Sequence, residues 1–184
     1  MRFNKENLRH AIQSLLKEQY TTLSFKVYRA VRDTLVSDYG EESIISGVGA
    51  MKHNSGRWMK KGICYVLYAS SNAETAIKEF FSNNEGDNKK LVLAEISVNL
   101  DKILDLTKKE TVKKLGLTTE DLLKGWQGKQ ESLTQAIGRF AYESGFEGLL
   151  TPSKANSNGV NLVIFSKKTP IKGVILEDWK LLET

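Results

Sequence analysis

The chain has 184 residues, of which 40% are hydrophobic and 27% charged, and its formal net charge is +5. This length and composition predict one soluble domain with a sizeable core. No apolar stretch approaches the roughly 20 residues that cross a bilayer, and the polar N-terminus does not resemble a signal peptide, so membrane and secreted classes are excluded. The single cysteine, Cys64, excludes internal disulfides and favours a reducing, cytoplasmic compartment.

The positive charge favours acidic partners, such as a phosphorylated small molecule, nucleic acid or an acidic protein. The lysines are spread along the chain in short pairs, and no dense basic tract with interleaved aromatic residues occurs. This distribution argues against direct binding of nucleic acid.

Residues 1–20 form an amphipathic N-terminal helix by pattern, with Asn4 as its cap and Phe3 packing onto Leu8. Its roles are packing on the domain or contact with another protein or a second copy. The remainder, residues 21–184, is predicted to form a single globular domain.

Residues 23–31 alternate as a strand does, and Arg29 falls on the otherwise apolar side. An unpaired buried guanidinium is costly, so Arg29 needs an anion or several acceptors. Two interpretations stay open: an internal carboxylate, or a ligand phosphate bound in a bidentate fork.

Residues 36–58 are predicted to form a long loop, which is often functional. Its Gly47-Val48-Gly49 run lacks the strand–glycine–helix context and the lysine of a phosphate-binding loop. The two histidines, His10 and His53, have no metal-ligand spacing, so no metal site is expected.

The stretch from Asn54 to Phe81 combines an apolar strand over residues 63–70 with a short helix. Ser71 and Glu74 fit a capping box that starts this helix, and Glu74 can pair with Lys78. Glu79, in contrast, has no charged partner three or four residues away and lies at the margin of the apolar face. It is either an exposed glutamate or a carboxylate that acts elsewhere.

The rest of the chain predicts, in order, a turn over residues 83–88, a strand over 91–98, helices over 101–106, 111–124 and 131–144, short extended segments, and strands over 160–166 and from about Ile171. Gly145 ends the last helix, and both prolines are expected in connections. With no repeat or linker, the fold class is a single α+β domain.

The loop after Pro152 contains Ser153, and Asn161 opens the following strand. Ser153 either makes a local turn hydrogen bond or serves a site. Nothing marks it as an activated nucleophile, because the two histidines do not supply a triad.

Six segments, in this order, resemble the RES domain, the toxin of RES–Xre toxin–antitoxin pairs. They are GRW at 56–58, LYAS at 67–70, ETAIKEF at 74–80, LDKILDL at 100–106, LTQAIGRFAYESGFEGLLTPS at 133–153 and NLVIF at 161–165. The resemblance extends over about residues 28–165.

The resemblance implies a fold related to ADP-ribosyltransferases, with a mixed β core and flanking helices. It also implies an enzyme that takes NAD+ as substrate, without a further cofactor, and cleaves the nicotinamide–ribose bond. Water or inorganic phosphate is the acceptor, whereas one branch of the family ADP-ribosylates a protein.

Matched position by position, the family's catalytic residues fall on Arg57, Tyr68 and Glu79, and its NAD+-contacting residues on Arg29, Ser153 and Asn161. The usual GGRWN form is altered here, with Ser55 in place of the first glycine and Met59 in place of the asparagine. This departure concerns loop contacts and the acceptor more than the bond that is broken.

The residue types agree with that chemistry. Loss of nicotinamide builds positive charge on the ribose, which a fixed carboxylate stabilises, and a cationic leaving group requires no general acid. The alternative from another class is a non-catalytic module that binds a nucleotide or acidic segment, and a nuclease is less well supported. The family further implies an Xre-type helix-turn-helix antitoxin that blocks the pocket; self-association stays open.

Overall fold

The computed structural model describes residues 4–52, 55–83, 90–128 and 130–183. Its strands are β1 (Thr21–Arg32), β2 (Tyr65–Ser70), β3 (Leu91–Asp105), β4 (Gly148–Pro152), β5 (Val160–Ser166) and β6 (Val174–Leu182). Its helices are α1 (Lys5–Glu18), α2 (Asp33–Tyr39), the 3-10 helix η1 (Glu41–Ile44), α3 (Val48–Lys52), α4 (Ala73–Asn83), α5 (Lys109–Lys114), α6 (Thr119–Leu123) and α7 (Leu133–Ser144).

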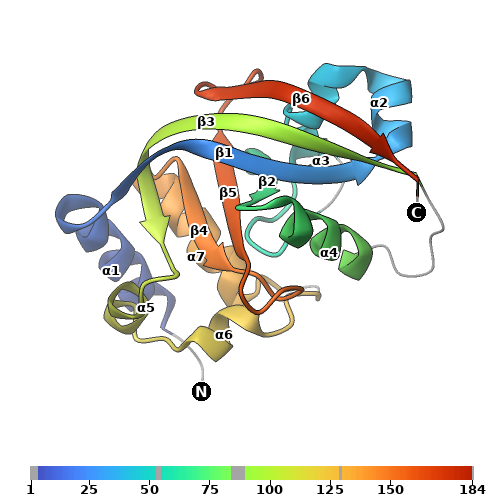
Figure 1. Ribbon diagram of the computed structural model, residues 1–184. Helices are drawn as coiled ribbons and strands as arrows, with labels where there is room; N and C mark the ends of the chain where they lie inside the picture. Colours follow the sequence, from blue (N-terminus) through green and yellow to red (C-terminus); the bar gives the residue numbers. More distant parts are fainter. Residues whose placement is uncertain (1–3, 53–54, 84–89, 129, 184) are drawn as a thin grey trace.

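The strands form one mixed sheet in the order β1-β2-β5-β4-β3-β6, and β1 also pairs with β3. The pairing therefore returns to its starting strand, with β6 added at the side of β3. Among the described strands, β3 and β4 are the only neighbours that run parallel. Figure 1 shows β1, β3 and β6 running side by side across the top, with β4, β5 and α7 beneath them. The predicted α+β class is confirmed.

Strands β1 and β2 share the shortest pairing in this ring of strands. The register joins them at one residue pair, Tyr28 with Ser70. On its other side β1 pairs with β3 along most of its length. Tyr28 and Ser70 both line a cavity of about 480 Å³.

Helix α1 begins as its sequence predicts. The Asn4 side chain accepts hydrogen bonds from the backbone N–H groups of Glu6 and Asn7, which satisfies donors at the helix start. Its apolar stripe is buried against α7 and contributes three residues to the core, Leu8, Ile12 and Leu15. The predicted contact of Phe3 with Leu8 lies outside the described residues.

Strand β3 corrects one prediction, because residues 101–106 continue the strand to Asp105 and are not helical. The apolar spacing there also fits a strand that is buried on both faces. Ile103 and Leu104 are fully buried in different apolar clusters, one on each face of the sheet. Strands covered on both faces read as continuous apolar runs, which periodicity does not separate from a helix.

Other boundaries also differ from the predictions. The expected loop over residues 36–58 contains three short helical segments, α2 (from Asp33), η1 and α3. The single helix expected over residues 111–124 is two, α5 and α6, separated where Gly116 adopts a positive φ of 70°. Pro152 ends β4, where it pairs with Val160, and the last strand starts at Val174. Most of the expected turn over residues 83–88 lies outside the described residues.

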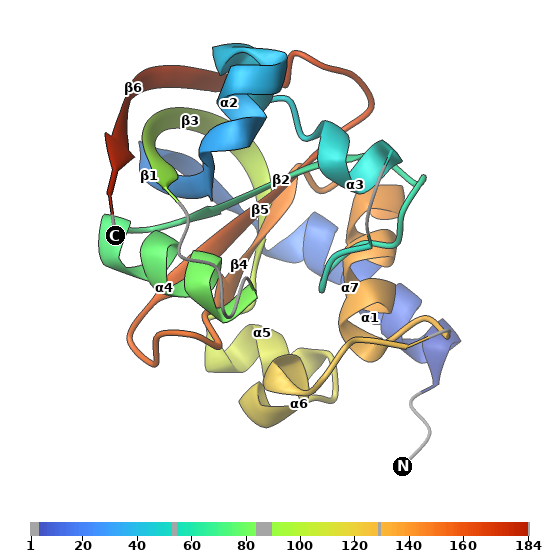
Figure 2. The same cartoon turned by 90° about the vertical axis from the view of Figure 1, so that its right-hand side faces the viewer.

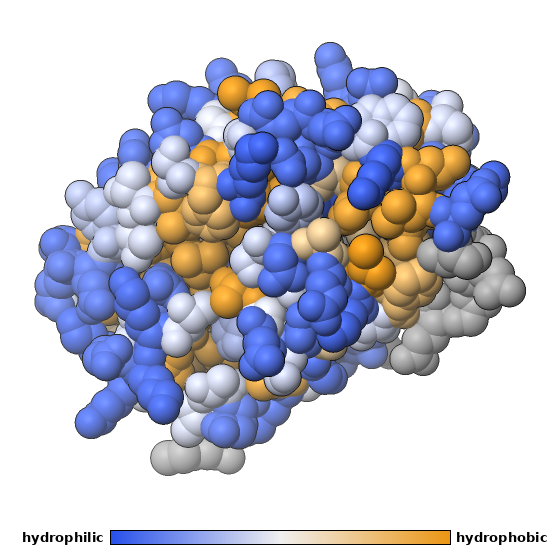
Figure 3. All heavy atoms as spheres, in the orientation of Figure 1, coloured by the Kyte–Doolittle hydropathy of each residue, from blue (hydrophilic) through white to orange (hydrophobic). Residues whose placement is uncertain are grey.

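The surface is mostly hydrophilic on the face in Figure 3, with hydrophobic side chains gathered in places that include the area over α4. The described helices include none that is long and apolar enough to cross a membrane.

Candidate functional site

Helix α4 carries the carboxylate that the sequence singles out, but it starts differently from the prediction. The side chain of Asn72 accepts a hydrogen bond from the backbone N–H of Thr75 at 2.8 Å, so Asn72 caps the helix. The predicted capping box of Ser71 and Glu74 is wrong, because the helix begins two residues after Ser71. Asparagine and serine are equally good caps, so the sequence did not distinguish Ser71 from its neighbour Asn72.

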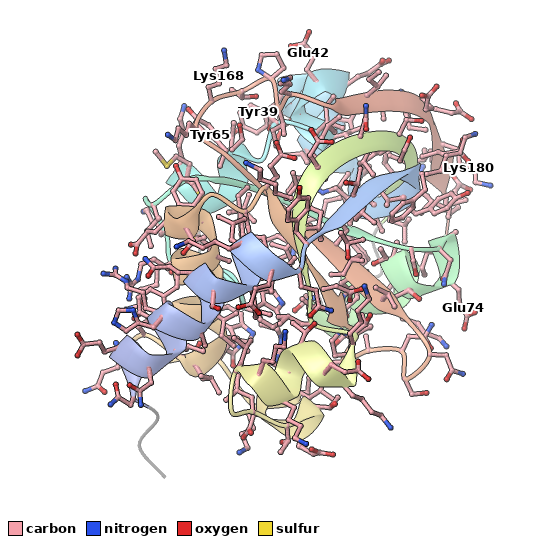
Figure 4. All side chains as sticks on the ribbon, turned by 90° about the vertical axis from the view of Figure 1, so that its left-hand side faces the viewer. Tyr39, Glu42, Tyr65, Glu74, Lys168 and Lys180 are labelled. Carbon is pink, nitrogen blue, oxygen red and sulfur yellow. The ribbon has the colours of Figure 1, made fainter. Side chains whose placement is uncertain are left out.

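The two glutamates of α4 have different surroundings. Glu74 points away from the fold (Figure 4) and pairs with Lys78 at 2.5 Å, as the spacing predicts. Glu79 is partly buried and lines the cavity. Its Oε1 accepts hydrogen bonds from Ser153 Oγ at 2.7 Å and from Asn161 Nδ2 at 2.6 Å. Donors with such short contacts fix the direction of a carboxylate.

Both donors are held in place by β4, β5 and the loop between them. Ser153 is 4% exposed, and its backbone N–H donates to Gly159 O at 2.9 Å across the loop. Its Oγ also accepts from the backbone N–H of Asn156 at 3.0 Å, so both the local turn bond and a longer-range contact are present. The Asn161 amide is oriented by Ser70 Oγ, which donates to its Oδ1 at 2.7 Å.

Tyr68, near the end of β2, contacts the segment that carries Arg57. Its hydroxyl oxygen accepts a hydrogen bond from the backbone N–H of Trp58 at 3.4 Å. A Cβ on Gly56 would lie 2.3 Å from the same hydroxyl oxygen, so only glycine permits this approach. Burial raises the pKa of Tyr68, which keeps the phenol protonated at neutral pH.

Arg57 connects this segment to the region after α6. Its Nη1 donates to the carbonyl oxygens of Leu122 at 3.2 Å and Lys124 at 2.9 Å. Burial lowers the pKa of Arg57, and the nearby carboxylate of Glu79 opposes that shift. The guanidinium and the carboxylate are thus close enough to interact electrostatically, although they form no direct ion pair among the described residues.

Helix α7 holds the Arg57 segment from behind, which the sequence reasoning missed. Gln135 Nε2 donates to Gly56 O at 2.9 Å, and Gln135 also completes a capping box with Ser132. At Gly138 the backbones come so close that a Cβ would lie 1.7 Å from Trp58 O. A glycine in the middle of an otherwise regular amphipathic helix was the available signal, because such a residue is unfavourable there without a packing reason.

Arg29, on β1, has a backbone partner. Its Nη1 donates to the carbonyl oxygen of Ile44, and burial lowers its pKa to about 10. No ion pair joins Arg29 to a carboxylate of the described residues. The internal-carboxylate interpretation therefore finds no support in the described part of the chain.

These side chains meet around one cavity of about 480 Å³. Five of the six residues that the sequence singles out line this cavity. The sixth, Ser153, does not line it but donates a hydrogen bond to Glu79, which does. The five are Arg29, Arg57, Tyr68, Glu79 and Asn161. Trp126 and Lys154, which the sequence reasoning did not select, line it too. In Figure 2, helix α4 lies at the left of the molecule and α6 lies at the bottom.

The described residues contain no group of three or more His, Cys, Asp or Glu side chains that could hold a metal ion. His53 lies outside them. The arrangement around the cavity, an oriented carboxylate with two guanidinium groups, suits an anionic ligand that develops positive charge next to the carboxylate.

Comparison with known proteins places this geometry in context. A family model described as the RES domain matches residues 26–181. A search of curated proteins finds no match. Among solved structures, the chain is similar to a chain in the crystal structure of the M. tuberculosis MbcT–MbcA toxin–antitoxin complex, with a TM-score of 0.74 and 22% sequence identity. The match covers 96% of this chain and 92% of that one, which shows a shared fold.

Proposed function

We propose that this chain, which belongs to the RES-domain family, is a toxin that degrades NAD+. The reaction is cleavage of the bond between nicotinamide and ribose, with water or inorganic phosphate as acceptor. The fold is then a variant of the ADP-ribosyltransferase core. The observation that carries this proposal is the oriented carboxylate of Glu79 in a cavity that also contains Arg29 and Arg57.

Glu79 has one oxygen engaged and one available. Oε1 accepts from Ser153 and Asn161, whereas no described residue donates to Oε2. A carboxylate held in this way needs no reorganisation when positive charge appears beside it, so it stabilises the transition state more than the ground state. We assign Oε2 to the ribose from which nicotinamide departs.

The proposed chemistry needs few groups from the protein. The bonding pair between the ribose carbon and the pyridinium nitrogen leaves with nicotinamide, which becomes neutral. The ribose carbon gains oxocarbenium character and forms a bond to an oxygen of phosphate or of water, and water then releases a proton to the solvent. No residue has to protonate the leaving group, which agrees with a site built on a single oriented carboxylate.

The remaining groups suit the rest of the dinucleotide. Guanidinium groups bind phosphates through paired N–H donors, so we assign Arg57 and Arg29 to the pyrophosphate. Tyr68 presents a neutral ring in the cavity wall, and we assign it to stacking on nicotinamide or its ribose. Arg57 keeps Nη2 for the ligand, because Nη1 is used by the two backbone carbonyls.

The proposal extends to a partner. The structural neighbour comes from a toxin–antitoxin complex, and the resemblance to RES–Xre pairs implies an antitoxin of the Xre type. We therefore propose that a cognate antitoxin of this type covers the cavity. Co-expression with a candidate Xre-type antitoxin, followed by co-purification and an NAD+ cleavage assay, tests this extension.

The decisive experiment measures nicotinamide released from NAD+ by the purified chain, with and without phosphate. We expect release by the wild-type chain and a loss of about 100-fold or more in kcat for Glu79→Gln, because the amide keeps the shape but removes the charge. The thermal midpoint of the variant checks that it is folded.

Three results would count against the proposal or redirect it. Undiminished turnover by folded Glu79→Gln would refute the role of this carboxylate. Binding of NAD+ without release of nicotinamide would favour the non-catalytic module. Transfer of labelled ADP-ribose to protein, with little free ADP-ribose, would identify a protein mono-ADP-ribosyltransferase instead.

A further inference from the structure

Trp126 lies in a polar stretch of the chain, residues 125–128, between α6 and α7. Trp126 is half-buried and lines the cavity, while its immediate neighbours are exposed glycine and glutamine. No local apolar patch accounts for an indole in such a position. An aromatic side chain of this kind at a cavity wall is a candidate for contact with a ligand.

Trp126 differs from the other aromatic residues of the cavity wall. Trp58 and Tyr68 belong to or pack on the apolar cluster of α1 and α7, and Tyr28 and Phe80 belong to or pack on the cluster under α4. Trp126 takes part in none of the three apolar clusters. Its indole N–H also donates no hydrogen bond to the described residues. The ring is therefore not engaged by the core in the described part of the chain.

The base of the segment is fixed. Thr118 and Asp121 form a capping box that starts α6, and Leu122 is buried at 1% exposure. Arg57 then holds the carbonyl oxygens of Leu122 and Lys124. Trp126 follows only two residues later, so the ring is attached to a well-anchored point on the cavity rim.

Arg57 also relates this ring to Glu79. The guanidinium interacts electrostatically with the carboxylate of Glu79 and donates hydrogen bonds to the backbone of the segment that leads to Trp126. Arg57, Glu79 and Trp126 all line the same cavity, so we place the guanidinium between the carboxylate and the ring. In NAD+ the pyrophosphate likewise stands between the nicotinamide riboside and the adenosine. A ligand with its scissile ribose at Glu79 and its phosphates at Arg57 extends its second base toward Trp126.

We propose that Trp126 is the adenine-stacking residue of this site, which rests on the proposed function for the direction in which the dinucleotide lies. Stacking on an indole is available to any flat base, but a purine offers the larger surface. The site then recognises adenine by its ring face and the pyrophosphate by its charge.

The test uses the full chain, with ADP and nicotinamide mononucleotide as separate probes in titration calorimetry. ADP carries adenine and the pyrophosphate, whereas nicotinamide mononucleotide lacks both adenine and the second phosphate. We expect Trp126→Ala to weaken ADP binding about tenfold, the loss of one base–aromatic stack, and to leave binding of the mononucleotide unchanged. Trp126→Phe should keep most of the affinity for ADP.

Fluorescence gives a second readout. The chain has three tryptophans, Trp58, Trp126 and Trp179. Stacked adenine should quench part of the emission, and the quenching should be lost in Trp126→Phe. The matched control is Trp179→Phe, on β6 and outside the cavity lining, which should still show the quenching.

The ADP measurement decides this proposal by itself. Unchanged ADP affinity in Trp126→Ala, no detectable binding of ADP by the wild-type chain, or an equal loss for both probes would overturn it. The proposed function is decided separately by nicotinamide release. A chain that binds ADP through Trp126 but leaves NAD+ intact would retain the stacking proposal and reject the proposed enzyme.

Discussion

Asn161 determines how the carboxylate of Glu79 is presented to the cavity. It donates from Nδ2 to Glu79 Oε1 and is itself held by Ser70 at its Oδ1. Because both ends of the amide are hydrogen-bonded, the positions of β2 and β5 determine the orientation of the Glu79 side chain on α4. Asn161 thus connects the position of the proposed catalytic group to the sheet.

We expect Asn161→Ala to lower kcat for nicotinamide release by about 10- to 100-fold, because small errors in the position of a catalytic group are costly. The KM for NAD+ should change less than kcat, since the arginines are untouched. Steady-state kinetics of nicotinamide release measures both. Ser70→Ala, which removes only the support of the amide, should have the same direction and a smaller effect; a larger effect than Asn161→Ala would contradict this order.

At this scale the local sequence pattern singled out the carboxylate but not the residues that hydrogen-bond to it. Glu79 stood out because its own helix gave it no charged neighbour. Ser153 and Asn161 lie 74 and 82 positions further along the chain, so no local pattern connects them to it. Only the resemblance to a family brought the three together before the structure did. Trp126 had neither signal, because an isolated tryptophan in a polar segment has no periodicity.

Helix α7 is the element that supports the proposed site most directly. It reaches the Arg57 segment through Gln135 and through the close approach at Gly138. Without a side chain at position 138, the helix backbone and the backbone of Trp58 come into contact. The position of Arg57 therefore depends on a residue that has no functional group.

We expect Gly138→Ala to destabilise the chain by about 1–3 kcal/mol, because the added Cβ would overlap the carbonyl oxygen of Trp58 and force the backbones apart. The same displacement should raise the KM for NAD+. Urea unfolding and kinetics measure the two effects. Gly49→Ala in α3 is the matched control, since no atom lies within 4 Å of its Cβ position, and it should be neutral or slightly stabilising. Equal midpoints for the two variants would contradict the packing argument.

Residues 160–166 coincide with β5, because a short apolar run that is bounded by polar connections is typical of a buried strand. The end of β3 is buried on both faces as β5 is, but there the prediction failed. At residues 101–106 the apolar residues fit a helix, and only the pairing of β3 with β4 and β1 distinguishes the strand. Hydrogen bonds between distant strands decide such cases, and they leave no periodic trace in a single sequence.

On the scale of the whole molecule, α1 is fastened to α7 by charged side chains around Glu131. Its carboxylate accepts from Arg139 Nε at 2.7 Å and Nη2 at 3.0 Å, and Lys5 of α1 binds it at 2.9 Å. Arg9 of α1 pairs with Glu143 of α7 at 2.6 Å. The hydrogen bonds from Arg139 lower the pKa of Glu131 to about 2.

This pKa gives the stability of the fold a defined pH dependence. In the unfolded chain Glu131 titrates near its ordinary value of 4.5, above its folded value of about 2. Its ionised form is therefore favoured by folding, and the contribution is complete above about pH 4.5 and lost as the pH falls toward about 2.

We expect Glu131→Gln to lower the free energy of unfolding by on the order of 1–2 kcal/mol at about pH 7, allowing for partial solvent screening. The difference from the wild-type chain should shrink as the pH is lowered through about 4 and 3. Urea unfolding at each pH measures it. Glu74→Gln, whose partner Lys78 is on the exposed face of α4, should cost less than about 0.5 kcal/mol. If the difference in the free energy of unfolding stayed constant with pH, the ion pairs around Glu131 would not be the cause of that difference.

Strand β3 has a consequence for how the molecule can be opened. One continuous backbone is paired with β1 along most of its length, with β6 along its first part and with β4 near its end. Separating the layer of β1, β3 and β6 from the strands beneath it would break the pairing of β3 with β4 and of β1 with β2. We therefore expect ligands to reach the cavity beside Glu79 through shifts of side chains and short connecting segments at its mouth. Covering this mouth would be enough to keep a ligand out.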